Sequence, residues 1–484
     1  MRKLRNYISG RWTDAAGGGR GLCVNPANQD EVLAETPASQ VADVDAAMRA
    51  ASDAFAGWSR TPMPKRAALL AGFLRRFETQ EEEFARTITA ENGKTLRESR
   101  TEFIAAVKEA DYQISHARRY GGKFKASEMP GVTCYLMRQP LGVVSLITPW
   151  NFPLNVACRK LVPALLAGNC CVLKPAEPTP LSAALLFAVL DQCGLPPGVP
   201  NLVIGRGSVI GDALTTHPAV KAISFTGSSA VGRGIAEKVG SRDIALQLEM
   251  GGKNPLVVLA DADMDKAVEA AVIGGFSCSG QWCTSTSRVI VEAPCYDAFV
   301  EKLAAAARAI TVGNGIEETT RMGPVCGRKQ YDTVLKYIEI GKGEGARLCA
   351  GGDALTTGSW ARGCFIAPTV FADVLPGMVI AREEVFGPVI SVIKALDFDD
   401  AVRLANDTCY GLASSIYTGD LARAQRFIAE SAVGLCHVNL PTAYKEPQLE
   451  FGGIKESGRG LPEAGECGLD FFTRHKAVYV KEQP

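Results

Sequence analysis

Short runs of β-branched and aliphatic residues alternate with longer helix-like segments through the middle of the chain. The pattern predicts strands at 142–148, 169–174, 201–204 and 220–225, with helices at 155–166 and 181–193 among them. Thr179 and Pro180 are predicted to be the N-cap and first residue of the second helix. Such alternation predicts a parallel sheet covered by helices on both faces, which binds ligands at the carboxyl ends of its strands.

The alternation begins again after residue 249. Strands at 255–259 and 288–292, with a helix at 265–274 between them, predict a second α/β domain. Helical spacing also occurs earlier in the chain, at Leu69, Leu70, Phe73, Leu74 and Phe77. The segments 121–139 and 468–484 are predicted to be strands that pair with each other or across a subunit boundary. The predicted fold class is α/β, with two doubly wound domains and a small additional β element.

Composition narrows the functional classes. The chain has 484 residues, with 52 basic and 52 acidic side chains, and this balance argues against a nucleic-acid-binding surface or a basic membrane patch. The sequence has no apolar run of about 18 residues and no signal-like start. Its 15 cysteines form no CxxC pair, and its four histidines are isolated. We therefore predict a cytoplasmic protein without a metal site.

Two glycine-bearing turns compete as a dinucleotide site. The turn at 205–211, which contains Gly207, follows a strand but departs from the GxGxxG spacing by one residue. The turn at 225–232 offers Gly227, Ser228 and free N–H groups at a helix N-terminus, which favours a pyrophosphate. Lys174 and Glu177 follow another strand and could bind ribose hydroxyls, unless they are only solvated loop charges. An acid there would repel a 2′-phosphate and favour NAD over NADP.

Three residues are candidates for catalysis. Cys283 lies among small and polar residues before a strand, where backbone dipoles could lower its pKa and activate the thiolate. Glu249 is followed by two glycines that leave space for a general base. Asn151 stands between two prolines, and its amide could donate to an oxyanion. Cys278 and the adjacent Cys170 and Cys171 are better interpreted as small buried residues.

Together these motifs resemble those of the NAD(P)-dependent aldehyde dehydrogenase superfamily. Seven segments occur in the family's order and cover nearly the whole chain: PWNFP (149–153), KPAE (174–177), FTGS (225–228), EMGGK (249–253), GQWC (280–283), EEVFGP (383–388) and FGGIK (451–455). The resemblance implies a Rossmann-like cofactor domain at 1–120 and 140–250 and a catalytic domain at 251–437. It also implies oligomerisation strands at 121–139 and 468–484, in a homodimer or homotetramer.

The resemblance also implies roles for individual residues. Cys283 would be the nucleophile, Glu249 the general base, and Asn151 the oxyanion donor beside the Cys283 N–H. Glu463 is similar to a second acidic residue of the family. Phe451 would contact the substrate. The residues implied for cofactor binding are Thr148, Pro149, Trp150, Lys174, Glu177, Gly207, Gly227, Ser228, Glu384 and Phe386.

The chemistry that the resemblance implies runs through a covalent intermediate. The thiolate adds to an aldehyde, the thiohemiacetal loses hydride to the nicotinamide, and water activated by Glu249 hydrolyses the thioester to a carboxylic acid. A CoA-acylating enzyme is an alternative, against which the presence of Glu249 argues. A catalytically silent relative is another, and Cys283, Asn151 and Glu249 together argue against it.

Arg159 points to a substrate class. It lies about two helical turns from Asn151, roughly 10 Å along a helix axis, and its guanidinium could pair with a substrate carboxylate. The Arg-Lys pair at this position is similar to that of semialdehyde dehydrogenases. The prediction is a short semialdehyde with a carboxylate, such as succinate or glutarate semialdehyde. The alternatives are an ion pair with a neighbouring acid, and an aromatic, aliphatic or amino aldehyde as substrate. Cys278 and Glu450 depart from the family pattern near its substrate tunnel.

Overall fold

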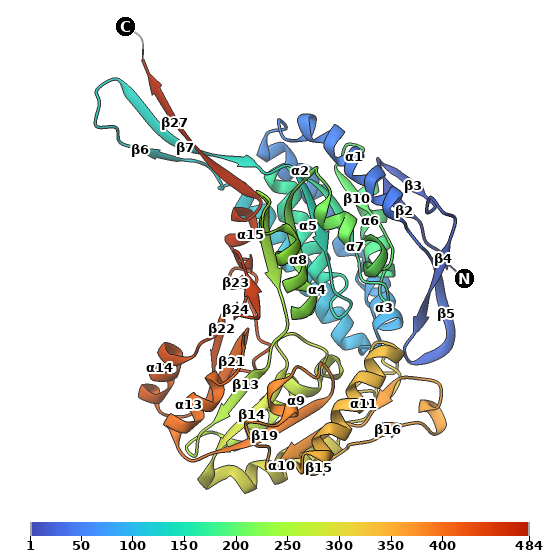
Figure 1. Ribbon diagram of the computed structural model, residues 1–484, viewed down its shortest axis with the longest axis vertical. Helices are drawn as coiled ribbons and strands as arrows, with labels where there is room; N and C mark the ends of the chain where they lie inside the picture. The colour runs from blue at the N-terminus through green and yellow to red at the C-terminus, as the bar shows by residue number, and fades with distance from the viewer. Residues whose placement is uncertain (1, 483–484) are drawn as a thin grey trace.

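The computed structural model describes residues 2–482, so residues 1 and 483–484 of the predicted ranges lie outside it. Two α/β bodies lie one above the other in Figure 1, and a narrow β arm projects from the upper body. The predicted α/β class with two doubly wound sheets is confirmed. In the described part of the chain, no helix has the length and apolar character needed to cross a membrane.

The first sheet has a parallel centre, in the order β12-β11-β8-β9-β10, with antiparallel strands at both edges. Four strands predicted from β-branched runs are found here, although the third ends two residues earlier than predicted. In sheet order the strands are β25 (Gly458–Arg459), β12 (Ala245–Glu249), β11 (Val220–Thr226), β8 (Val143–Ile147), β9 (Cys170–Lys174), β10 (Pro200–Leu202), β2 (Asn6–Ile8) and β3 (Arg11–Thr13).

Helices cover both faces of this sheet (Figure 1). They are α1 (Val41–Trp58), α2 (Met63–Phe77), α3 (Glu81–Asn92), α4 (Leu96–Ala117), α5 (Asn155–Ala167), α6 (Leu181–Asp191), α7 (Gly207–Thr216) and α8 (Ser229–Val239). Every residue of α5 is buried, so its two charged side chains, Arg159 and Lys160, need partners within the protein.

The predicted cap of α6 is wrong. Pro180, and not Thr179, is the N-cap residue, and its side chain has no donor or acceptor for the helix end. The carboxylate of Glu91 on α3 accepts hydrogen bonds from the N–H groups of Leu181, at 2.7 Å, and Ser182, at 3.0 Å. A side chain 90 residues away therefore satisfies the free N–H groups that a local cap would otherwise bind.

The second sheet is parallel except at one edge. Its order is β15 (Arg347–Ala350), β18 (Thr369–Ala372), β19 (Val389–Ala395), β14 (Thr286–Glu292), β13 (Asn254–Val258), β21 (Ala413–Tyr417) and β22 (Leu435–Val438). The helices beside it are α9 (Met264–Phe276), α10 (Tyr296–Arg308), α11 (Arg328–Gly343), α12 (Val379–Arg382), α13 (Phe398–Asn406) and α14 (Leu421–Glu430).

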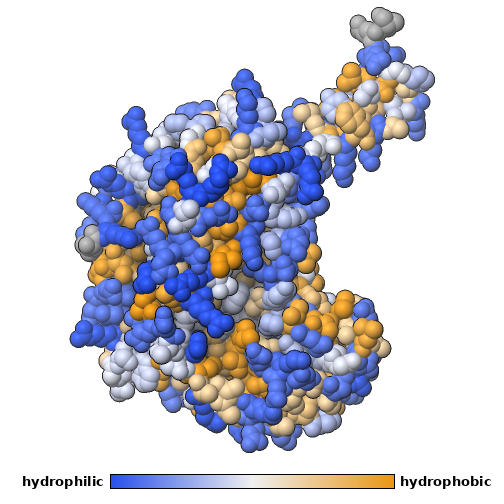
Figure 2. Space-filling model, turned by 180° about the vertical axis from the view of Figure 1, so that it is seen from behind, coloured by the Kyte–Doolittle hydropathy of each residue, from blue (hydrophilic) through white to orange (hydrophobic). Residues whose placement is uncertain are grey.

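The projecting arm is a three-stranded antiparallel sheet. β27 (Thr473–Lys481) pairs along its length with β7 (Val132–Pro140), which also pairs with β6 (Lys123–Lys125). The segment predicted as one strand is thus a hairpin. Phe124 and Tyr479 on the arm are 78% and 75% exposed, and Figure 2 shows apolar side chains among polar ones on its surface.

Shorter elements complete the chain. They include the N-terminal sheet β1 (Arg2–Lys3), β5 (Asn28–Pro37) and β4 (Arg20–Asn25), the pairs β16 (Ala354–Leu355) with β17 (Phe365–Ile366) and β20 (Tyr410–Gly411) with β24 (Ile454–Lys455), and α15 (Cys467–Asp470). The pair β23 (Glu450–Phe451) with β26 (Glu463–Ala464) places Phe451 directly opposite Glu463. This pair brings two predicted site residues together.

Candidate active site

Residues from both α/β bodies line a cavity of about 290 Å³. Asn151 and Arg159 come from the first body, Cys283 and Phe386 from the second, and Phe451 from the short β23 strand. The carboxyl ends of β8, β11 and β12 and the segment before β14 lead to this cavity. The structure therefore places the predicted nucleophile, oxyanion donor and substrate residues around one space.

The backbone before Cys283 is tightly constrained. Cys278 and Ser279 have φ values of 50° and 57°, and Gly280 has a φ of 68°. A Cβ at Gly280 would lie 2.1 Å from the carbonyl oxygen of Gly387, so only glycine fits there. Asn254 then donates to the carbonyl of Cys283 at 2.8 Å. These contacts hold the nucleophile segment in place.

Burial controls the acidity of the Cys283 thiol. Burial raises its pKa to about 12, and the charge of Arg159 offsets only part of that effect. Burial therefore outweighs any lowering of this pKa by nearby backbone dipoles. The thiol must lose its proton to a base as the reaction begins.

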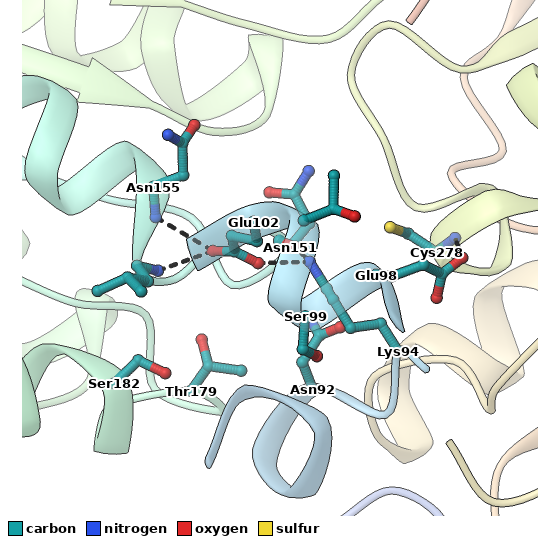
Figure 3. A network of polar contacts seen from close by, with 12 residues as sticks. Asn92, Lys94, Glu98, Ser99, Glu102, Asn151, Asn155, Thr179, Ser182 and Cys278 are labelled. Atoms are coloured by element: carbon teal, nitrogen blue, oxygen red, sulfur yellow. Dashed lines mark hydrogen bonds and ion pairs between the residues drawn. The ribbon is translucent and has the colours of Figure 1, made fainter. Parts of the chain in front are cut away.

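A buried ion pair positions Asn151 (Figure 3). Lys94 Nζ lies 2.7 Å from Glu102 Oε2 and donates to the Asn151 carbonyl oxygen at 2.7 Å. Glu102 Oε1 accepts from the N–H groups of Leu154, at 2.9 Å, and Asn155, at 3.1 Å. The pair thus holds the segment on both sides of the turn into α5. The Asn151 side chain donates to the carbonyl of Gln281, two residues before the nucleophile, at 3.0 Å.

Replacing Lys94 with methionine should weaken both the fold and catalysis. The side chains of Lys94 and Glu102 are fully buried, and removing one partner of such a pair costs about 3–5 kcal/mol. We expect that loss in the free energy of unfolding measured by urea denaturation, together with a fall in kcat. Arg100→Met, which removes an exposed charge from α4, the helix that carries Glu102, is the control. Equal effects of the two variants would contradict the positioning role of Lys94.

Glu249 is buried at the end of β12 and is not among the described residues that line the cavity, although Met250 and Gly251 are. Burial, followed by the charge of Glu463, raises the pKa of its carboxyl well above the usual range. One carboxyl oxygen has no hydrogen-bond partner among the described residues. The raised pKa favours the protonated carboxyl, and Glu249 must be in its carboxylate form to act as a base.

Glu463 joins a buried network beside Glu249. It accepts hydrogen bonds from Lys160 Nζ and from Thr226 Oγ1. Lys160 also donates to Ser224 at 2.7 Å, and Arg159 Nη1 lies 3.6 Å from Glu463. The structure thus brings the predicted second acid close to the charged residues of α5.

The guanidinium of Arg159 is hydrogen-bonded to residues of the protein itself. Its Nε and Nη2 each donate to the Glu109 carboxylate at 2.9 Å, and Nη2 also donates to Asn155 at 2.9 Å. Burial would lower the pKa of Arg159, but Glu109 outweighs this and raises it. Arg159 thus forms the ion pair with a neighbouring acid that was the alternative to a substrate role, and the acid is Glu109. The substrate role of Arg159 stays a prediction, since its Nη1 faces no such partner at hydrogen-bond distance.

Predicted cofactor residues form another part of the cavity. Pro149, Trp150, Gly227, Ser228 and Glu384 line it, and the Phe386 ring lies edge-on to Trp150 at 5.3 Å. Gly207 begins α7. Lys174 is buried and donates to the Pro175 carbonyl, whereas Glu177 is exposed and accepts from Arg206 at 3.0 Å. Burial lowers the pKa of Lys174 to about 8.

Three features of this surface fit a dinucleotide. Ser228 caps α8 without a side-chain hydrogen bond to the helix, which leaves its hydroxyl and the helix N-terminus for a phosphate. The buried Thr148 hydroxyl has no partner among the described residues. Glu384 accepts from the Gly252 N–H at 2.9 Å, and a Cβ at Gly251 would meet its carboxylate at 2.1 Å. Burial raises the pKa of Glu384 to about 7.

Sequence reasoning missed Glu109, Lys160 and Lys445. Lys445 lies in the loop after β22, lines the cavity, and binds Glu109 at 2.7 Å. One signal was available: Glu102 and Glu109 are seven residues apart on the buried face of α4. Carboxylates on an apolar helix face need cationic partners. Lys445 had no comparable signal, because its loop has no periodic pattern.

Comparisons with known proteins agree with this site. Residues 12–478 match the Aldehyde dehydrogenase family. The chain is 40% identical to the alpha-ketoglutaric semialdehyde dehydrogenase of Bacillus subtilis over 98% of both chains. It is 41% identical to the 2,5-dioxopentanoate dehydrogenase of Saccharolobus solfataricus, over 98% of this chain and 99% of the relative.

The chain is also similar in structure to a solved aldehyde dehydrogenase. The betaine aldehyde dehydrogenase of Staphylococcus aureus in complex with NAD+ is 34% identical, with a TM-score of 0.97 over 99% of this chain and 95% of that chain. The chain therefore belongs to the aldehyde dehydrogenase family, and the predicted family and enzyme class are confirmed.

Proposed function

We propose that this enzyme oxidises a short aldehyde bearing a carboxylate, such as succinate, glutarate or α-ketoglutarate semialdehyde, to the corresponding acid with NAD. The observation that carries the proposal is the position of Arg159, whose guanidinium lines the cavity that contains Cys283. The names of the B. subtilis and S. solfataricus relatives support the same substrate class.

The protein groups divide the reaction between them. Cys283 attacks the aldehyde carbon, and Asn151 and the Cys283 N–H donate to the oxyanion that forms. Bound NAD would supply the nicotinamide that accepts hydride. Glu249 takes a proton from the water that hydrolyses the thioester on Cys283, and Glu463 modulates the charge of Glu249. Loss of the acid product then restores the free thiol.

NAD would lie along the surface that carries the cofactor residues. Thr148, Pro149 and Trp150 end β8, Lys174 and Glu177 would hold the adenosine ribose, and the other contacts would come from Gly207, Gly227, Ser228, Glu384 and Phe386. The NAD+ complex of the S. aureus relative supports this cofactor. NADP remains a second candidate, because Arg206 lies beside Glu177 and could pair with a 2′-phosphate.

Replacing Glu177 with serine should improve the use of NADP. The change removes a negative charge that repels a 2′-phosphate and frees Arg206 from its ion pair. We expect kcat/KM for NADP to rise about five- to tenfold, as for the loss of ~1 kcal/mol of repulsion at a solvated site. Glu301→Ser, at an exposed position of α10, controls for net charge. Equal efficiency with NAD and NADP in the unmodified enzyme would contradict this role.

The two large sheets and the projecting arm support different functions for different parts of the chain. We assign cofactor binding to residues 1–120 and 140–250, catalysis to 251–437, and subunit association to 121–139 and 468–484. The exposed apolar side chains of the arm support association into a homodimer or homotetramer. All fifteen cysteines are free, which supports a reducing, cytoplasmic location.

The experiment for the proposed function measures NADH formation from ω-carboxy, ω-amino, aromatic and aliphatic aldehydes, with and without CoA. We expect turnover without CoA, with the highest kcat/KM for an ω-carboxy aldehyde. A requirement for CoA would identify an acylating enzyme, and no turnover of any aldehyde would identify a silent relative.

A further inference from the structure

A cluster of three cations and two carboxylates includes the cavity-lining residues Arg159 and Lys445. Arg159, Lys160 and Lys445 are its cations, and Glu109 and Glu463 are the carboxylates that pair with them. Burial and the charge of Glu463 raise the pKa of the neighbouring Glu249 carboxyl, which disfavours a third negative charge in the cluster. Lys160 is neutralised by Glu463, and Arg159 by Glu109. Lys445 is the cation without a carboxylate of its own.

Glu109 is shared between two cations. Its Oε1 accepts from Arg159 Nη2 at 2.9 Å and from Lys445 Nζ at 2.7 Å. Burial would raise the pKa of Glu109, but the two cations outweigh it and lower the pKa to about 2. Burial and, after it, the charge of Arg159 lower the pKa of Lys445. A second carboxylate at this position would relieve the repulsion between the two cations.

Lys445 is held in place by the surrounding residues. Its Nζ also donates to Asn155 at 3.0 Å, and the Nζ lies 5.9 Å from the centre of the Phe451 ring. Just before it, the Tyr444 carbonyl lies 2.9 Å from Nε2 of the buried His437. The next residue, Glu446, is half-buried and accepts from the Tyr444 hydroxyl. The Lys445 side chain lines the cavity and is 24% exposed, so a ligand bound there can contact it.

We infer that Lys445 supplies the uncompensated positive charge that binds the distal carboxylate of the substrate, with Glu109 positioning Lys445 and Arg159 side by side. The inference rests on the proposed function and deepens it, because it identifies the residue that sets the preference for charge. Arg159 contributes through Nη1 alone, since Glu109 occupies the other side of its guanidinium. The substrate class is an aldehyde with one anionic group at its far end.

The test compares glutarate semialdehyde with its methyl ester, which has the same carbon chain but no charge. We expect Lys445→Met to lower the ratio of kcat/KM for the acid to that for the ester about tenfold or more, as for the loss of a charge-assisted contact. The ratio is the readout, because Lys445 also acts on the pKa of Cys283 and its loss can affect both substrates. A purely structural role would lower both values and leave the ratio unchanged.

Two further variants sharpen the result. Lys445→Arg keeps the charge and should restore most of the preference. Lys266→Met removes an exposed charge at the start of α9 and should leave the ratio unchanged. If the unmodified enzyme has no preference for the acid, the proposed substrate class fails. If it prefers the acid and Lys445→Met retains that preference, the inference about Lys445 is overturned while the proposed function stands.

Discussion

Replacing Cys283 with alanine should abolish aldehyde oxidation and leave the fold and NAD binding in place. Cys283 is the cysteine that lines the cavity with Asn151 and Arg159, and its sulfur would be the atom that bonds covalently to the substrate. Without it, the aldehyde has no covalent route to a thioester. We expect turnover to fall by about 10³-fold or more, measured as NADH formation under saturating aldehyde.

A matched cysteine variant separates this loss from a general effect. Cys409 is exposed and does not line the cavity, so Cys409→Ala should retain normal turnover. Thermal unfolding and NAD titration of Cys283→Ala should match those of the unmodified enzyme. Retention of more than a few per cent of turnover, on the order of 1–5%, would remove Cys283 from its assigned role.

Replacing Glu249 with glutamine should separate the two halves of the reaction. The variant can still form the thioester, but it has no carboxylate to take a proton from water. We expect a burst of one NADH equivalent per active site, followed by a steady rate lowered about 10²- to 10⁴-fold. Rapid-mixing absorbance measurements give both phases.

The pH dependence of the unmodified enzyme provides a second readout for Glu249. Burial and the charge of Glu463 raise the pKa of its carboxyl, so more of the base form is present at higher pH and the steady rate should rise as the pH rises. That rise in thioester hydrolysis should be lost in Glu249→Gln. A steady rate that is the same in both proteins would contradict the general-base role.

The parallel sheets could be predicted because their strands are short, buried and β-branched. The run at 169–174 corresponds to β9 and the run at 288–292 lies within β14, since burial on both faces selects such residues. The cap of α6 could not be predicted in this way. Glu91 reaches its N-terminus from α3, and no local pattern encodes a contact across 90 residues.

In the active site, too, local motifs could be predicted from the sequence, whereas contacts between distant segments could not. Cys283, Asn151 and Glu249 lie in short motifs whose residue types indicate their chemistry. The raised pKa of Cys283 could not be predicted, because it depends on burial that results from packing of the two bodies. The pairing of Arg159 with Glu109 also requires two helices, α4 and α5, to lie side by side. A guanidinium predicted to face the substrate is therefore held mainly by the protein.

The most direct measurement for the central claim is the kcat/KM of the unmodified enzyme for glutarate semialdehyde and for its methyl ester, with NAD as cofactor. The account predicts that the acid is preferred about tenfold or more, the effect of one charge-assisted contact of ~1.5–3 kcal/mol. Equal values, or higher values for the ester or for aromatic and long aliphatic aldehydes, would contradict the claim that this cavity selects a carboxylate.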